Sequence, residues 1–228
     1  MIPLRDDIRS RRYPLVTRLL VAVNVLVFLY ETSLSRQDLW ILVQTLGVVP
    51  TRYFPLSHAL HFGWILLIPL VASIFLHGGW MHVLSNMLYL WIFGDNVEDR
   101  MGRGRFLVFY LVVGMLGNLV HAWAAMGSQV PAIGASGAIA GVLGAYIVSF
   151  PHARVATLVP IGIFLTVLNI PAGLLLLGWF LLQLANGVAA LGVATAQQVA
   201  WWAHIGGFVA GMVLVGWFVP RNRQRDWS

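Results

Sequence analysis

Four polar side chains of this chain, Ser136, His204, His82 and Asn86, lie inside or at the edge of strongly apolar stretches. A serine hydroxyl is a weak nucleophile until a base within hydrogen-bond reach takes its proton. The N–H groups of histidine and asparagine can stabilise negative charge that develops on a carbonyl oxygen. A fold that brings these four side chains together could therefore carry out acyl transfer through the serine.

The composition of the chain places these groups in a membrane. Of the 228 residues, 59% are hydrophobic and 10% are charged, whereas roughly 25% of the residues of a soluble domain are charged. A single core could not bury so many apolar side chains, so lipid must be the solvent for much of the protein. The absence of cysteine excludes disulfides, thiolate nucleophiles and Cys-based zinc sites.

We expect an all-α polytopic membrane protein built from six transmembrane helices. The first span follows the basic segment 1–18 and shows no small-residue cleavage pattern, so we interpret it as uncleaved. The stretch 32–79 is expected to be either interfacial or partly re-entrant and not a seventh span, and the stretch 155–170 is expected to be interfacial. The six spans are placed near 19–30, 80–94, 105–126, 133–150, 171–192 and 200–219.

The arginines predict the orientation of these spans. All 14 basic residues are arginine, and with the N-terminus inside only Arg36 and Arg52 fall in outer segments. The positive-inside rule therefore favours an arrangement with both termini inside. The predicted organisation is a basic cytoplasmic segment, a membrane domain and a basic cytoplasmic tail, with no nucleic-acid partner. Their bounds are 1–18, 19–219 and 220–228.

In this topology the second, fourth and sixth spans all start at the outer face, so the four polar side chains share one membrane depth. On the sixth span His204 shares a helix face with Gly207 and Gly211. On the fourth span Ser136 lies beside a strip of glycines along which another helix can approach closely. We call the glycine strip of the fourth span and the Gly207–Gly211 face of the sixth span the two smooth faces. If these faces meet, His204 lies next to Ser136. The strip consists of Gly134, Gly137, Gly141 and Gly144.

Each feature taken alone has an ordinary structural explanation. A single histidine in an apolar helix is usually a structural hydrogen bonder, and glycine-rich helical motifs mostly serve packing. The joint placement of four suitable groups favours a site. His77 could contact His82 and hold it in position without itself touching a substrate. The remaining histidines, to which no role is assigned, are His58, His61, His121 and His152.

The motifs, taken together in their order and spacing, resemble those of the rhomboid intramembrane serine proteases. The similarity covers about 75–215. The matching segments are His82-Val-Leu-Ser-Asn86, Gly94-Asp-Asn-Val-Glu98-Asp-Arg100-Met-Gly102, Gly134-Ala-Ser136-Gly137 and Ala203-His204-Ile-Gly-Gly207-Phe-Val-Ala-Gly211.

The resemblance implies a serine endopeptidase that cleaves transmembrane segments of other membrane proteins near the outer face. Ser136 would be the nucleophile and His204 the general base, in a dyad without aspartate. His82 and Asn86 would stabilise the oxyanion. The resemblance implies a requirement for the bilayer and for no metal or other cofactor.

Two departures from the family pattern are visible. Ala140 stands where some members place an aromatic ring against the base, so another group must orient His204. The Trp-Arg pair that some members carry in the first outer loop is not evident in 65–76. Glu98 and Arg100 match a Glu-x-Arg signature, which we interpret as a structural tie between the inner end of the second span and the following loop.

Other functions fit the sequence less well. A metalloprotease would need His-Glu-x-x-His, which is absent, and Asp95 and Asp99 lie at one helix end, so they cannot face each other as an aspartyl pair. A transporter would show an inverted repeat. The alternative that stays open is a non-catalytic rhomboid-like protein that binds transmembrane clients. The expected location is the plasma (inner) membrane of a bacterium or archaeon, and the sequence specifies no oligomeric state.

Overall fold

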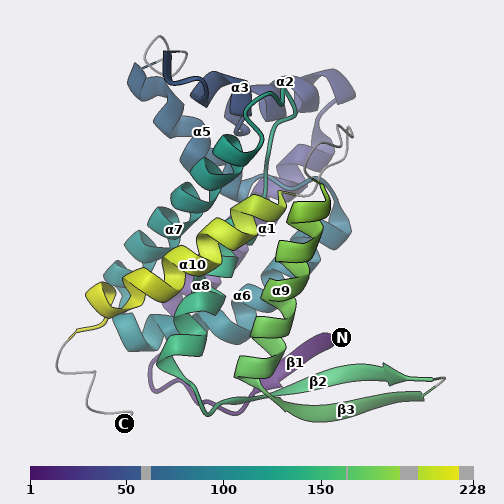
Figure 1. Ribbon diagram of the computed structural model, residues 1–228, viewed down its shortest axis with the longest axis vertical. Coiled ribbons are helices and arrows are strands. Elements are labelled where there is room, and N and C mark those ends of the chain that lie inside the picture. Colours follow the sequence, from purple (N-terminus) through teal and green to yellow (C-terminus); the bar gives the residue numbers. More distant parts are fainter. Residues whose placement is uncertain (58–62, 163, 191–199, 221–228) are drawn as a thin grey trace.

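The computed structural model is a bundle of helices with a small antiparallel sheet at one end (Figure 1). It describes residues 1–57, 63–162, 164–190 and 200–220. The elements in chain order are β1 (Ile2–Asp6), α1 (Leu15–Ser33), α2 (Arg36–Leu46), α3 (Pro50–Tyr53), η1 (Gly63–Leu66), α5 (Leu67–Ala72), η2 (Ser73–Phe75), α6 (Trp80–Met101), α7 (Arg103–Ala124), α8 (Ser136–Ser149), β2 (Arg154–Ile161), β3 (Phe164–Pro171), α9 (Ala172–Ala189) and α10 (Trp201–Phe218).

Each of the six apolar stretches forms a helix, but fewer than six qualify as membrane spans. In the described part of the chain, α1, α7, α9 and α10 are long and apolar enough to cross a membrane. A fifth span results if Gly63–Phe75 and Trp80–Met101, which meet at 87°, count as one broken span. Helix α8 has only 14 residues. Length and composition therefore support four or five spans where the sequence led us to expect six.

Helix α8 occupies the centre of the bundle. It packs against α6, α7 and α10, and every residue from Gly137 to Tyr146 is buried. A helix enclosed by other helices does not have to match the thickness of the bilayer, which explains how a 14-residue helix can serve here.

Glycines set the close contact between α8 and α10. A Cβ atom on Gly207 would overlap the carbonyl oxygen of Gly137, and one on Gly211 would overlap the carbonyl oxygen of Gly141. The two helix backbones therefore touch along the strip that the sequence singled out. This contact between the two glycine faces is the condition under which the sequence places His204 next to Ser136.

The all-α expectation is wrong for one part of the chain. The stretch 155–170, expected to lie at the membrane interface in an all-α protein, forms the hairpin β2–β3, and β1 pairs with β2 to complete a three-stranded antiparallel sheet. The stretch is rich in β-branched residues, and Gly162 has the positive φ of +58° that its turn requires. Because β1 comes from the other end of the sequence, no local pattern predicts this pairing.

The stretch 32–79 forms short helices. Within its described residues, α2, α3, η1, α5 and η2 are each too short to span a bilayer. Helix α2 has no buried residue and is capped by Ser35, whose Oγ accepts a hydrogen bond from the backbone N–H of Asp38 at 3.1 Å. His58 and His61, to which no role was assigned, lie outside the described residues.

Glu98 joins the end of α6 to the beginning of α1. Its carboxylate accepts hydrogen bonds from the backbone N–H groups of Val16 (3.0 Å) and Thr17 (2.7 Å) and from the Thr17 hydroxyl (2.8 Å). These N–H groups lie in the first turn of α1, where a helix leaves its donors without internal partners. The structural role expected for Glu98 is present, but its partner is the first helix and not the loop after α6. Arg100, its partner in the Glu-x-Arg signature, lies in the last turn of α6.

Candidate active site

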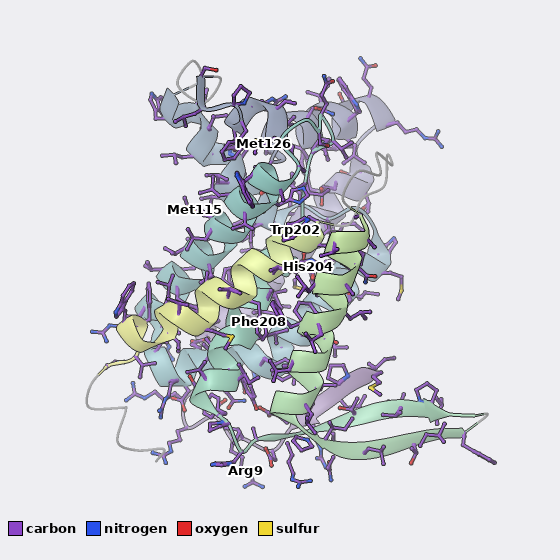
Figure 2. The ribbon with its side chains drawn as sticks, viewed as in Figure 1. Arg9, Met115, Met126, Trp202, His204 and Phe208 are labelled. Atoms are coloured by element: carbon purple, nitrogen blue, oxygen red, sulfur yellow. The ribbon has the colours of Figure 1, made fainter. Side chains whose placement is uncertain are left out.

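Ser136 and His204 are in direct contact. Ser136 is the first residue of α8, and His204 lies in the first turn of α10, beside Trp202 (Figure 2). The Oγ of Ser136 and the Nε2 of His204 are 2.7 Å apart, a hydrogen-bond distance. The predicted juxtaposition of these two side chains is therefore observed.

A third residue, Gln183 of α9, contacts the other side of the His204 ring. Its Oε1 lies 2.9 Å from Nδ1 of His204, and its side chain is 5% exposed. One turn earlier on α9 the Trp179 ring lies against the imidazole, with centroids 5.8 Å apart at 32°. The ring of Trp201 meets it edge-on at 90°. The orientation that Ala140 cannot supply thus comes from α9 and from the start of α10.

His82 and Asn86 lie one turn apart on α6 and face the same space as Ser136. A Cβ atom on Gly134 would lie 2.6 Å from Nε2 of His82 and 3.6 Å from Oγ of Ser136. Gly134 has φ of +128°, and both this backbone conformation and the missing side chain leave the space between the two groups open.

The hydrogen bonds around His82 and Asn86 fix which atoms can donate. The backbone N–H of Gly78 points at Nδ1 of His82 at 3.4 Å, so in a neutral ring the proton lies on Nε2, the nitrogen that faces Ser136. Nδ2 of Asn86 lies 3.1 Å from Nε2 of His77. An amide nitrogen carries two hydrogens, and the contact with His77 uses only one.

His77 supports this part of the site, as its position suggested. Its ring meets that of His82 edge-on, with centroids 5.1 Å apart. Its backbone N–H donates to the buried carboxylate of Glu31 on α1, at 3.1 Å to Oε2. His77 therefore contacts both His82 and Asn86, and α1 holds it in place.

A second set of contacts, which the sequence did not lead us to expect, holds the segment before Ser136. The backbone N–H of Gly134 donates to the carbonyl oxygen of Ser73 at 2.9 Å. The side-chain amide of Asn118 on α7 donates to the Ser73 hydroxyl and to the Leu70 carbonyl oxygen, each at 3.0 Å. The buried amide of Asn118 thus connects α7 to the segment before α6. That segment in turn holds Gly134, two residues before Ser136.

These side chains open into one cavity of about 650 Å³. Its walls are mostly apolar and carry a small number of polar groups, as in many ligand-binding sites. The polar residues in its lining are His82, Ser85, Asn86, Ser136, Gln183 and His204. In the described residues no three His, Asp or Glu side chains are grouped so that they could hold a metal ion.

Gln183 contacts His204 directly, and the sequence did not lead us to expect it at this site. It is an amide side chain inside an apolar, uncharged helix, and a strongly polar group in such a position is a functional candidate by default. Trp179 lies one turn away on the same face. The signal was present in the sequence, but it points to no particular partner until α9 is placed against α10.

Comparison with known proteins places these motifs in a family. The family described as Rhomboid domain matches residues 58–221. "Rhomboid protein 1, mitochondrial" of Saccharomyces cerevisiae is 33% identical over 168 residues, 69% of this chain and 44% of that protein. "Presenilin-associated rhomboid-like protein, mitochondrial" of Homo sapiens is 30% identical over 218 residues, 92% of this chain and 48% of that protein. The chain thus spans less than half the length of these relatives.

The relatives correct one expectation. We expected the plasma membrane of a bacterium or archaeon, whereas these similar proteins are named as mitochondrial proteins of yeast and human. The expectation of a prokaryotic location is therefore wrong. The multi-pass membrane character is unaffected, because it rests on the apolar helices.

Proposed function

The chain belongs to the rhomboid family, and on this basis we propose that it is an intramembrane serine endopeptidase that cleaves transmembrane segments of other proteins. The observation that carries the proposal is the 2.7 Å contact between Oγ of Ser136 and Nε2 of His204 in the wall of a cavity. Ser136 is the nucleophile and His204 is the general base.

Gln183 prepares His204 for this role. An amide oxygen can only accept a hydrogen bond, so the Nδ1 of His204 must be the donor in its contact with Oε1 of Gln183. A neutral imidazole carries one proton, which leaves the lone pair of Nε2 directed at the Ser136 hydroxyl. Gln183 therefore selects the tautomer that can take the proton of Ser136.

The reaction proceeds through an ester. Ser136 Oγ forms a bond to a peptide carbonyl carbon while its proton moves to Nε2 of His204. The C–N bond then breaks, and Nε2 delivers the proton to the leaving nitrogen. A water molecule attacks the resulting ester with His204 again as base, which releases the carboxylate product and restores Ser136.

His82 and Asn86 stabilise the negative charge on the carbonyl oxygen. The proton on Nε2 of His82 and the second amide hydrogen of Asn86 are donors toward the cavity, and the N-terminus of α8 adds backbone N–H groups without helical partners. Stabilisation of this kind is usually the largest single contribution to catalysis of acyl transfer.

We also propose the six-span topology with both termini inside, with α1, α6, α7, α8, α9 and α10 as the spans. The domain bounds stay 1–18, 19–219 and 220–228, of which residues 221–228 lie outside the described part. The site then lies near the outer face, where transmembrane substrates would be cut. The names of the relatives support a mitochondrial membrane as the location.

Labelling with a fluorophosphonate probe tests the proposal without a known substrate. The purified protein in lipid should be labelled, and Ser136→Ala and His204→Ala should abolish the labelling. Ser85→Ala is the matched control, because Ser85 lines the same cavity but its hydroxyl donates to the His82 carbonyl oxygen at 3.0 Å. Absence of labelling in folded wild-type protein would favour the non-catalytic, client-binding alternative.

A further inference from the structure

The hairpin β2–β3 exposes apolar side chains on both of its faces. Phe164 (72% exposed) and Leu168 (42%) lie on one face, and Leu165 (70%) and Val167 (54%) lie on the other. No charged residue occurs between Val155 and Pro171. Exposed edge strands in water usually carry charged side chains, so this surface is not suited to water.

The hairpin also lies where a membrane surface would be. It projects sideways from the end of the bundle opposite His204 and extends past α9 (Figures 1 and 2). β2 follows the end of α8, and α9 begins at Ala172, directly after β3. If these helices cross a bilayer, the hairpin lies at the level of one leaflet's surface.

Positive charge gathers around the same sheet. Five exposed arginines belong to the N-terminal segment or begin β2, and they outnumber the aspartates that lie in this segment (Asp6 and Asp7) or accept hydrogen bonds from it (Asp95 and Asp99). The anionic headgroups of a membrane leaflet complement such a surface. Arg9 lies at this end of the molecule (Figure 2). The five arginines are Arg5, Arg9, Arg11, Arg12 and Arg154.

The backbone of β3 limits how deeply the hairpin can enter lipid. In the described residues β3 pairs only with β2, so its outer edge presents N–H and C=O groups without strand partners. Hydrocarbon cannot satisfy such groups, whereas headgroups and interfacial water can. A hairpin that lay flat on the membrane surface would need only one apolar face. Because β2–β3 has exposed apolar side chains on both faces, we expect it to enter the leaflet to a limited depth.

We propose that β2–β3 is a lipid anchor: its outer half is immersed among the headgroups and upper acyl chains of one leaflet, and the arginines pair with anionic headgroups. This anchor would hold the start of α9, the helix that carries Gln183, at a fixed depth. The proposal does not depend on protease activity.

The absence of native cysteine allows a clean test. Single variants Phe164→Cys and Leu165→Cys are labelled with an environment-sensitive fluorophore in vesicles of phosphatidylcholine, with or without phosphatidylglycerol. Nitroxide lipids should quench both labels, and more strongly with the nitroxide near the headgroup than near the chain end. Quenching should be stronger in the vesicles that contain phosphatidylglycerol, and Arg5→Gln with Arg9→Gln should remove that difference.

Two control positions calibrate the result. Leu181, 60% exposed on α9, gives the signal of a lipid-facing residue, and Gln129, in the loop between α7 and α8, gives the signal of an aqueous one. Labels at Phe164 and Leu165 that respond like Gln129, with iodide quenching and no lipid quenching, would overturn the proposal. So would shielding from both quenchers combined with Phe164–Phe164 cross-linking, which would indicate pairing with a second copy. Lipid quenching at only one of the two positions would overturn immersion.

Discussion

Nδ1 of His204 lies 2.9 Å from Oε1 of Gln183, on the side of the ring opposite Ser136. The imidazole is thus held between a hydroxyl on α8 and an amide on α9, and both partners are reached by one rotamer of His204. This contact joins α8, α9 and α10 and makes the position of His204 depend on Gln183.

Replacing Gln183 should slow the reaction of Ser136 without unfolding the protein. Gln183→Leu removes the acceptor at Nδ1, and the loss of one buried hydrogen bond, about 1–2 kcal/mol, corresponds to roughly a tenfold lower rate of fluorophosphonate labelling. Gln183→Glu keeps an acceptor and should retain most of the rate. Equal rates for wild type and Gln183→Leu, with wild type active, would show that Gln183 does not position His204 while the protease proposal stands.

His82 should be needed for stabilisation of the oxyanion. His82→Ala removes a donor near Ser136, and loss of one such donor typically lowers turnover by about 100- to 1,000-fold. His82→Gln provides another N–H donor and should recover part of the activity. The measurement is the rate of cleavage of a transmembrane peptide in vesicles, with thermal unfolding as the check on folding. Full activity of His82→Ala would remove His82 from the site.

The glycine contact between α8 and α10 should be sensitive to a single methyl group. Gly207→Ala forces a Cβ into the Gly137 carbonyl oxygen, and overpacking of this kind costs about 1–3 kcal/mol. The thermal midpoint should fall, and labelling of Ser136 should fall with it because the two helices move apart.

Gly216→Ala is the matched control for that variant. Gly216 lies on the same helix α10, and a Cβ there has no atom within 4 Å. Its stability should be unchanged or higher, since alanine favours helices over glycine by roughly 1 kcal/mol. Similar losses in both variants would contradict the close approach at Gly207.

Asp6 should make stability depend on pH at the sheet end of the molecule. Burial raises the pKa of Asp6 to about 7, the hydrogen bond from Tyr146 (2.6 Å) opposes the rise, and the charge of Asp95 adds to it. The folded pKa lies above the ordinary value of 3.8, so the protonated form favours folding. This contribution is complete below about pH 4 and is lost as the pH rises through about 7.

The check is the thermal midpoint as a function of pH. Wild type should lose stability between about pH 4 and pH 7, and Asp6→Asn should flatten that part of the curve. Asp38→Asn, which removes a carboxyl group on the distant helix α2, should follow the wild-type curve. A wild-type curve that is flat or rises over this interval, or an unchanged slope in Asp6→Asn, would contradict the role assigned to Asp6.

Much of the candidate site could be predicted because its signals are local. The spacing of Gly207 and Gly211 places them on one helix face with His204, and small residues on facing helices identify where backbones can approach closely. The contact between Ser136 and His204 follows from that packing. Their catalytic roles stay predictions that the labelling experiment tests.

The sheet and the partner of Glu98 could not be predicted in the same way. β1 pairs with β2, and Glu98 caps α1, across long separations in the sequence. The β-branched residues of 155–170 favoured strands, but their apolar character was equally compatible with an interfacial segment. Both the strand that pairs with β2 and the helix end that Glu98 contacts belong to the N-terminal part of the chain, and only the packing of the bundle sets where that part lies.

The sequence by itself determined that this is a membrane protein with apolar helices, and which serine and histidine could react, because hydropathy and helical periodicity are properties of neighbouring residues. The tertiary structure alone decided that Gln183 holds His204, that α8 is short and enclosed, and that a two-faced apolar hairpin projects from the bundle end. These features depend on the rotation and depth of each helix relative to the others. Packing between segments that are distant in the sequence sets this rotation and depth, so no pattern of neighbouring residues predicts them.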